Sequence, residues 1–239
     1  MSIVFDSTAG DQAIVISHAS ELSVNPGTTE MTIACWFKCP VNTIGTIVSK
    51  RSTSSAGFQV GVTTYSGIEK LFTRFGGVLN LTSTSAADDG AWHSAVFVNR
   101  DVSGVYRSFI YQDGVLVSSS GAAPASGNAT NTMDVLINAR RDVDNTDFAF
   151  VGDFTTSDVR IYDGVAFTAE EAASFHARNG NDTLFGGLVG RWKLKEGHPT
   201  ETVSGSGSVK DWTPNANNGT PNSTPDYDED AVRLRRRRA

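Results

Sequence analysis

Oxygen-bearing side chains gather in one short stretch of the sequence, where they could bind a metal ion. Asp142, Asp144 and Asp147 occur there, with Asn145 and Thr146 between the last two. Carboxylate, amide and hydroxyl oxygens are the ligands that calcium prefers in proteins. The sixth position of the stretch is Asp147, where an EF-hand loop requires glycine. The pattern leaves two interpretations open, a calcium-binding rim loop and a solvated, charged hairpin loop, and it favours the second.

The histidines and serines form no pattern that is typical of catalysis. The four histidines are scattered along the chain, at His18, His93, His176 and His198. The sequence contains no Ser–His–Asp set, no H-x-x-x-H spacing and no glycine-rich loop for phosphate. His93 follows a tryptophan in an apolar strand pattern, which indicates a structural role. We therefore expect no enzyme activity from these residues.

The two cysteines are expected to be free thiols. Cys35 and Cys39 are four residues apart in a predicted strand, which separates them by about 13 Å. A disulfide requires Cα atoms within about 7 Å of each other. A zinc site would need a second Cys or His pair, which the sequence lacks. The thiols should pack as small apolar residues, as expected for a protein made in a reducing compartment.

Three aromatic residues are candidates for stacking on a sugar ring. Glycan sites combine exposed aromatic side chains with a few polar groups, and Tyr65, Tyr106 and Trp212 lie in polar surroundings that fit this pattern. Trp36, Trp92 and Trp192 lie in strand patterns and should be core residues. The plainer interpretation is that the three candidates are separate surface or core residues.

The end of the chain is strongly basic. Its last seven residues hold Arg233, Leu234, Arg235, Arg236, Arg237 and Arg238. The net charge of the chain is −6, so without these five arginines it is −11. The acidic body argues against a nucleic-acid-binding surface on the domain itself. The tail is expected to bind an acidic partner, an identical subunit included, and Val232 and Leu234 would let it pair as a strand.

The elements that must position these residues are mostly short strands. Residues 31–39 are apolar on both faces, as expected of a central strand, and 108–118 form a hairpin around Asp113 and Gly114. Residues 157–162 alternate between polar and apolar, which predicts a half-buried strand. Thr168 and Glu171 form a capping box that begins one short helix, ending near 178–180. The pattern favours a β-sandwich.

The order of several segments resembles the laminin G-like branch of the concanavalin A-like lectin/glucanase superfamily. The resemblance covers roughly residues 3–220. The segments that carry it are 31–37, 47–50, 90–96, 109–116, 150–152, 158–162, 168–171, 188–194, Asp211 and 217–220. Segment 188–220 usually opens such a domain, whereas here it closes the domain as a permuted segment.

The resemblance implies an all-β jelly-roll sandwich of two antiparallel sheets with one short helix. We expect one such domain over residues 1–225, followed by a tail over 226–239 that is first acidic and then arginine-rich. Glucanase members carry an E-x-D-x-x-E motif on one strand, and this chain has none. Relatives often hold calcium in rim loops, which makes calcium the one cofactor to consider.

The functional prediction is a non-catalytic binding or assembly module. Plain laminin G-like domains are frequent in bacteriophage virions, so we expect a capsid decoration or tail attachment protein that contacts other virion subunits or its own copies through the tail. Host-surface glycans are a further expected partner. The N-terminus resembles no signal peptide and no stretch would span a membrane, so the predicted location is a virion made in the host cytoplasm. The alternative is a soluble, calcium-assisted lectin-like protein.

Overall fold

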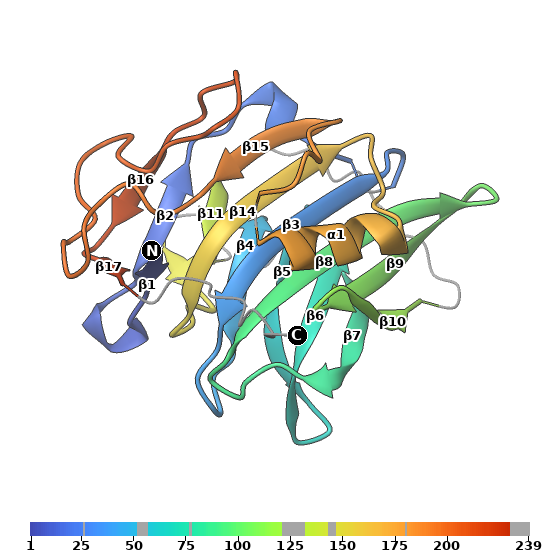
Figure 1. Cartoon of the computed structure of the whole chain (residues 1–239), viewed down its shortest axis with the longest axis horizontal. Helices are drawn as coiled ribbons and strands as arrows, with labels where there is room; N and C mark the ends of the chain where they lie inside the picture. Colours follow the sequence, from blue (N-terminus) through green and yellow to red (C-terminus); the bar gives the residue numbers. More distant parts are fainter. Residues whose placement is uncertain are drawn as a thin grey trace, which may run out of the picture.

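Two antiparallel sheets packed face to face make up the protein in the computed structural model (Figure 1). The structure describes residues 1–25, 27–51, 57–76, 78–120, 132–142, 147–179 and 181–229. These residues contain one α-helix, α1 (Ala169–Arg178), and the short 3₁₀ turns η1 (Ser7–Ala9) and η2 (Ser20–Leu22). The predicted all-β sandwich with one short helix is confirmed. None of the described helices is both long and apolar enough to cross a membrane.

The first sheet has eight strands in the order β10-β9-β8-β3-β14-β1-β17, and β15 also pairs with β14. These strands are β1 (Ser2–Val4), β3 (Met31–Lys38), β8 (Trp92–Val102), β9 (Val105–Gln112), β10 (Val115–Ser119), β14 (Thr155–Asp163), β15 (Leu188–Trp192) and β17 (Asp226–Asp228). Because β14 has a bulge after Ser157, it pairs with β1 before the bulge and with β15 after it.

The second sheet has seven strands in the order β16-β2-β11-β4-β5-β6-β7. They are β2 (Ala13–Ile16), β4 (Gly45–Lys50), β5 (Phe58–Tyr65), β6 (Ile68–Phe75), β7 (Val78–Ala86), β11 (Val135–Ile137) and β16 (Gly219–Asn222). A small hairpin of β12 (Arg140–Arg141) and β13 (Phe148–Ala149) is separate from both sheets.

Strand β3 is buried on both faces, as its sequence predicts. Ile33, Cys35 and Phe37 belong to the core between the sheets, whereas Ala34 and Trp36 belong to a second apolar cluster that includes Ala172 and Phe175 of α1. Strand β3 is therefore apolar on both sides, and α1 covers its outer face (Figure 1). Both cysteines are free and buried, as expected.

The helix begins and ends as its sequence signals predict. The Thr168 hydroxyl accepts a hydrogen bond from the Glu171 N–H, and the Glu171 carboxylate accepts one from the Thr168 N–H, which completes the capping box. Asn179 adopts the left-handed conformation that ends the helix. Its buried residues, Ala172 and Phe175, pack against the sheet.

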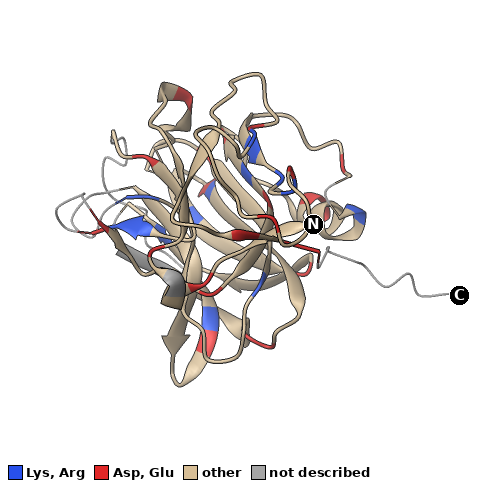
Figure 2. Cartoon of the chain, turned by 90° about the vertical axis from the view of Figure 1, so that its left-hand side faces the viewer, with Lys and Arg blue, Asp and Glu red and all other residues tan. Residues whose placement is uncertain are grey.

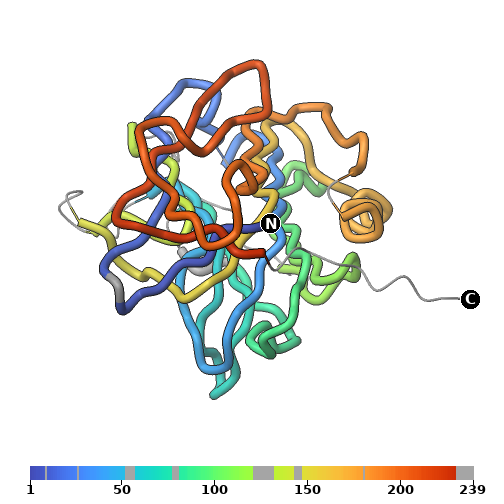
Figure 3. Tube along the Cα trace, turned by 60° about the vertical axis from the view of Figure 1, so that its left-hand side comes forward, coloured from blue at the N-terminus to red at the C-terminus, as the bar shows by residue number. Residues whose placement is uncertain are grey.

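The two ends of the described chain meet on the sheets. β16 pairs with β2 and β17 pairs with β1, so the closing segment fills the edges beside the first two strands (Figure 3). The sequence placed the start of the tail at residue 226, but Asp226–Asp228 form an edge strand with Tyr227 buried. The sandwich thus extends to residue 228. The sequence pattern indicated a tail because Tyr227 is surrounded by acidic residues, although Tyr227 itself is buried.

The prediction that residues 157–162 form a half-buried strand is wrong. Every residue of β14 from Thr155 to Tyr162 is buried. The charged residues Asp158 and Arg160 lie on its outward face, where Phe175 of α1 and Asp182 cover Arg160. Their charges are compensated within the protein, so polar alternation did not indicate exposure to solvent.

His93 joins β8 to two turns and is structural, as predicted. Its Nδ1 lies 2.7 Å from Asp113 Oδ2 and its Nε2 lies 3.0 Å from Asp89 Oδ1. The hydrogen bond to Asp113 raises the pKa of His93, and Asp89 adds to this against the opposing effect of burial, so that the pKa is about 9. The His176 ring nitrogen also lies 3.7 Å from Asp113.

We expect His93 to make stability fall between neutral and alkaline pH. Because its folded pKa is raised, its contribution is complete below the unfolded value of about 6.5 and is lost as the pH rises through about 9. The loss should be about 1–3 kcal/mol in the free energy of unfolding. Urea unfolding of wild type and His93→Gln at pH 6 and pH 9.5 measures it. An equal pH dependence in both proteins would contradict the assignment.

Candidate functional site

The predicted metal residues do not form a metal site in the described part of the chain. Asp142 and Asp147 face each other across a hairpin, where the Asp142 N–H donates to the Asp147 carbonyl. The Asp147 N–H also lies 3.4 Å from the Asp142 carboxylate. Asp144 lies outside the described residues, and among the described residues no group of three His, Cys, Asp or Glu could hold a metal ion. Calcium binding by this loop stays a prediction.

The three predicted aromatic residues lie on three different elements and do not form one site. Tyr65 ends β5, with 51% of it exposed and the Lys70 ammonium 5.5 Å from its ring, and Tyr106 is part of β9. Trp212 lies in the closing segment, where 54% of it is exposed. Of these three residues, Trp212 has a side chain that contacts both an acidic and a basic residue, Glu196 and Lys193. The tail residues Arg233–Arg238, with Leu234 among them, lie outside the described residues.

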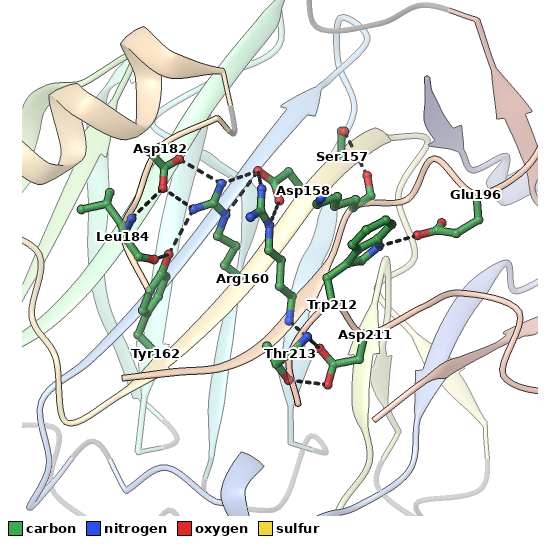
Figure 4. Close-up of polar contacts among 12 residues, drawn as sticks. Ser157, Asp158, Arg160, Tyr162, Asp182, Leu184, Glu196, Asp211, Trp212 and Thr213 are labelled. Atoms are coloured by element: carbon green, nitrogen blue, oxygen red, sulfur yellow. Dashed lines mark hydrogen bonds and ion pairs between the residues drawn. The ribbon is translucent and has the colours of Figure 1, made fainter. Parts of the chain in front are cut away.

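A buried ionic network on the outer face of the first sheet lies beside Trp212 (Figure 4). Arg160 is fully buried and donates to Asp158 at 2.6 Å and to Asp182 at 2.7 and 2.9 Å. Its guanidinium also lies 5.0 Å from the centre of the Phe175 ring. Arg191 of β15 donates to the other oxygen of Asp158 at 2.7 Å. One carboxylate at the bulge of β14 therefore joins two strands.

The turn that carries Trp212 is fixed to β15 by Asp211. The Asp211 carboxylate accepts hydrogen bonds from the N–H groups of Arg191, Thr213 and Asn217, and Asn218 accepts one from the Asp211 N–H. Asp211 and residues 217–220 were among the segments that carried the family resemblance. Their physical role is to close this turn. The backbone N–H of Trp212 donates to the Arg191 carbonyl at 2.7 Å. This bond places the Trp212 indole beside the ionic network.

The Trp212 side chain is held in place by two charged residues. Its Nε1 donates to Glu196 Oε1 at 3.0 Å (Figure 4), and the Lys193 ammonium lies 3.7 Å from the ring centre. Burial lowers the pKa of Lys193, and the positive charges of Arg191 and Lys195 lower it further. An exposed aromatic ring of fixed orientation is thus presented at the surface.

Glu196 also lines a hollow in the loop that follows β15. The hollow has a volume of about 290 Å³. Its lining is mostly polar and consists of Glu196, Gly197, His198, Glu201, Thr202, Ser204, Ser208 and Tyr227. The Ser208 hydroxyl is buried and has no hydrogen-bond partner among the described residues.

Tyr227 is buried, lines the hollow and lies near two acidic residues, Glu196 and Glu201. A Cβ atom on Gly197 would lie 2.1 Å from the Tyr227 ring, so the loop backbone lies directly on the ring because residue 197 is glycine. Burial raises the pKa of Tyr227 to about 12, and the charges of Glu196 and Glu201 add to the effect. The phenol therefore stays protonated and can donate a hydrogen bond throughout the physiological pH range.

The two glutamates of the hollow are held as hydrogen-bond acceptors. Glu196 accepts from Trp212 Nε1 on one oxygen and from the Lys195 N–H at 2.9 Å on the other. Glu201 accepts from the His198 N–H at 2.8 Å. The hollow therefore offers carboxylate oxygens, hydroxyls and a phenol beside an exposed indole. This combination suits a ligand with many hydroxyl groups and an apolar ring face.

Of these residues, the sequence alone indicated only Trp212. Residues 196–207 are rich in glycine, serine and threonine and show no strand or helix period, and Tyr227 was assigned to the tail. Glu196 follows an apolar strand by a few residues, which was a weak signal for a site. Only the folded structure shows that this loop lies against Tyr227 and beside Trp212.

Comparison with known proteins identifies the family. A sequence model described as the concanavalin A-like lectin/glucanases superfamily matches residues 8–173, which is more than half of the chain. The chain belongs to this superfamily. No curated protein sequence matches the chain. The matched region ends within α1, so the hollow and Trp212 lie in the segment that the family pattern does not cover.

Three solved structures share the fold at low sequence identity. A putative carbohydrate binding protein from Bacteroides ovatus is 17% identical with a TM-score of 0.60, and the match covers 94% of this chain and 60% of that one. A SAP-like pentraxin from Limulus polyphemus is 17% identical with a TM-score of 0.51, covering 72% and 85%. The CBM40 of a Ruminococcus gnavus sialidase, bound to α2,3-sialyllactose, is 10% identical with a TM-score of 0.50, covering 69% and 97%.

Removing Asp182 from the ionic network should destabilise the protein. The Asp182→Asn variant leaves Arg160 buried with one carboxylate instead of two, at an expected cost of about 2–4 kcal/mol in the free energy of unfolding. Urea unfolding at pH 7 measures this cost, with Asp11→Asn on the surface as the control. Burial alone would raise the pKa of Asp182, but its hydrogen bonds and ion pair with Arg160 lower it on balance.

The stability of wild type and that of Asp182→Asn should depend differently on pH. Because the folded pKa of Asp182 is lowered, its contribution is present above the unfolded value of about 3.9 and is lost as the pH falls through the folded value. Wild type should therefore lose more stability than Asp182→Asn between pH 5 and pH 2. Equal stability of the two proteins at pH 7 would show that the pair contributes no net stabilisation.

Proposed function

We propose that this protein is a non-catalytic carbohydrate-binding module whose ligand occupies the hollow beside Trp212. The observation that carries the proposal is the fixed, exposed indole that shares Glu196 with a polar hollow of about 290 Å³. An apolar sugar face would stack on Trp212. Its hydroxyls would donate to Glu196 and Glu201 and exchange hydrogen bonds with Ser208 and Tyr227.

The family and two structural neighbours support a glycan ligand. The Bacteroides ovatus protein is described as a putative carbohydrate binding protein, and the Ruminococcus gnavus module was solved with a bound sialyllactose. At such low identity these likenesses establish the fold, and the ligand of this chain rests on its own hollow. Since the acceptors are two carboxylates, the proposed ligand is a neutral sugar.

A glycan array followed by titration calorimetry on the best ligand tests this proposal. Trp212→Ala should weaken binding about 5- to 30-fold, since the stacking of one aromatic ring contributes about 1–2 kcal/mol. Glu201→Gln should weaken it as well, because a charged acceptor becomes a neutral one. Phe185→Ala removes another exposed aromatic residue, outside the hollow, and is the matched control.

Two results would contradict the proposal. One is the absence of any neutral glycan ligand on a broad array. The other is a ligand whose affinity is unchanged by both Trp212→Ala and Glu201→Gln. Release of reducing sugar from the bound glycan would replace the non-catalytic reading with hydrolysis. The same titration in EDTA tests the predicted calcium loop, because a calcium-assisted lectin loses its ligand when calcium is removed.

The virion role remains a second proposal, supported by charge. The body carries −11 and the last seven residues carry five arginines, so one copy can attract another or a different acidic subunit. Figure 2 shows acidic residues, in red, on several loops and strands of the body. The partner surface would be provided by such residues. Low-salt conditions would strengthen the attraction, because exposed charges are screened by salt.

Deleting residues 232–239 tests the role of the tail. We expect the truncated protein to lose self-association, or binding to its partner subunit, in sedimentation velocity at 50 mM salt. Its free energy of unfolding should stay unchanged, because the deleted residues follow the last strand of the sandwich. A variant with lysine at the five arginine positions keeps the charge and should retain association. Unchanged association after deletion would refute the tail hypothesis.

A further inference from the structure

A second pocket lies on the outer face of the seven-stranded sheet and has the opposite charge. Its volume is about 80 Å³, and Gln59, Thr63, Phe72, Arg74, Arg140 and Phe150 line it. It is built from β5, β6, the β12–β13 hairpin and the residue that follows that hairpin. None of these residues belongs to the hollow beside Trp212.

The backbone explains why a cavity forms at this place. Residues 59, 61 and 63 point to the same face of β5, and Gln59 and Thr63 line the pocket on either side of Gly61. A Cβ atom on Gly61 would lie 2.2 Å from the Gly45 carbonyl, so the bulged β4 permits only glycine there. The Phe150 carbonyl accepts a hydrogen bond from the Thr46 N–H at 2.8 Å, which holds Phe150 over the sheet.

Two arginines stack on the two aromatic rings of the pocket. The Arg74 guanidinium lies 5.9 Å from the centre of the Phe72 ring, and that of Arg140 lies 5.5 Å from the Phe150 ring. The rings contact each other edge to face, with centres 6.1 Å apart. In the described part of the chain, no carboxylate forms an ion pair with Arg74 or Arg140. Burial lowers the pKa of Arg140, and the charge of Arg74 lowers it further.

Buried polar atoms in the pocket lack partners. Gln59 is 1% exposed, and its Nε2 donates to the Thr46 hydroxyl at 2.8 Å. Its Oε1 has no hydrogen-bond partner among the described residues, and neither has Nε of Arg140. A buried amide oxygen or guanidinium N–H without a partner is unfavourable, because it has given up its hydrogen bonds to water. A ligand that accepts from arginine and donates to Gln59 would remove this cost.

We infer that this pocket binds a hydroxycarboxylate group. The carboxylate would pair with Arg74 and Arg140, because the planar guanidinium forks match its two oxygens. A neighbouring hydroxyl would donate to Gln59 Oε1, and the carbon skeleton would contact Phe72 and Phe150. The small volume admits only the acidic end of a larger molecule. That end is either a free hydroxy acid or the uronic acid of a glycan.

Titration calorimetry with glycolate, D-glucuronate, D-glucose and phosphate at 50 mM salt tests the inference. Both carboxylates should bind saturably, whereas glucose should not bind at this pocket and phosphate should bind at least tenfold more weakly. Glucuronate that binds more than tenfold more tightly than glycolate identifies a glycan end, and equal affinity identifies a free acid. No saturable binding of either carboxylate up to 20 mM overturns the inference.

Variants separate this pocket from the Trp212 hollow. Arg74→Gln with Arg140→Gln should weaken carboxylate binding at least tenfold, while Arg178→Gln, an exposed arginine on α1, should leave it unchanged. The double variant should be at least as stable as wild type in urea, because it removes two neighbouring like charges from a desolvated place. Should the double variant unfold, Arg74→Gln alone is titrated instead. Carboxylate binding that is undiminished in the folded variant, or that is lost in Trp212→Ala, overturns the assignment.

Discussion

The ion pairs of Asp158 are the constraint on which the closing half of the structure depends. Asp158 lies at the bulge of β14, where the backbone adopts a positive φ of 47°. From there it reaches Arg160 on its own strand and Arg191 on β15. A charged carboxylate that is buried without such partners would cost several kcal/mol. The network therefore fixes β15 and α1 relative to the same strand, since Arg160 also contacts Phe175 and Asp182.

This arrangement shows how the sandwich covers a polar face. Most sandwich strands bury one face and leave the other to water, and alternation in the sequence normally records this. In β14 the outward face carries charges, yet α1 and the segment with Asp182 exclude water from it. The same cover supports β15, whose following turn carries Trp212. The hollow beside Trp212 is thus connected to the first sheet through Arg191 and Asp211.

The two pockets use opposite chemistry on one scaffold. The hollow near Trp212 offers carboxylates and hydroxyls, whereas the pocket near Phe72 offers guanidinium groups and an amide oxygen. In both, a glycine lets backbone approach closely: Gly197 lies on Tyr227, and Gly61 lies under the Gly45 carbonyl. Both also retain a buried polar atom without a partner among the described residues. Such unpaired atoms are rare in protein interiors, and in the two proposed sites a bound ligand would complete their hydrogen bonding.

Local sequence signals determined much of the fold. The apolar run of β3, the Asp113-Gly114 hairpin and the Thr168–Glu171 capping box each depend on neighbours within a few residues, and each is present in the structure. Their order along the chain also indicated the superfamily. Trp212 was one of three candidates because an aromatic residue in polar surroundings is typical of glycan sites. These features need no knowledge of what lies across the sheet.

Only the tertiary structure decided the rest, because it depends on residues that are far apart in the chain. β14 is buried because Asp182 and Phe175 cover Arg160, and Tyr227 belongs to the sandwich because it pairs across to Ile3. Glu196 and Glu201 become part of a hollow only where their loop meets Tyr227. The pocket of Arg74 and Arg140 likewise joins β6 to a distant hairpin. The spacing of residues in the sequence predicts local conformations. Burial and charge pairing depend on contacts between residues that are far apart in the chain.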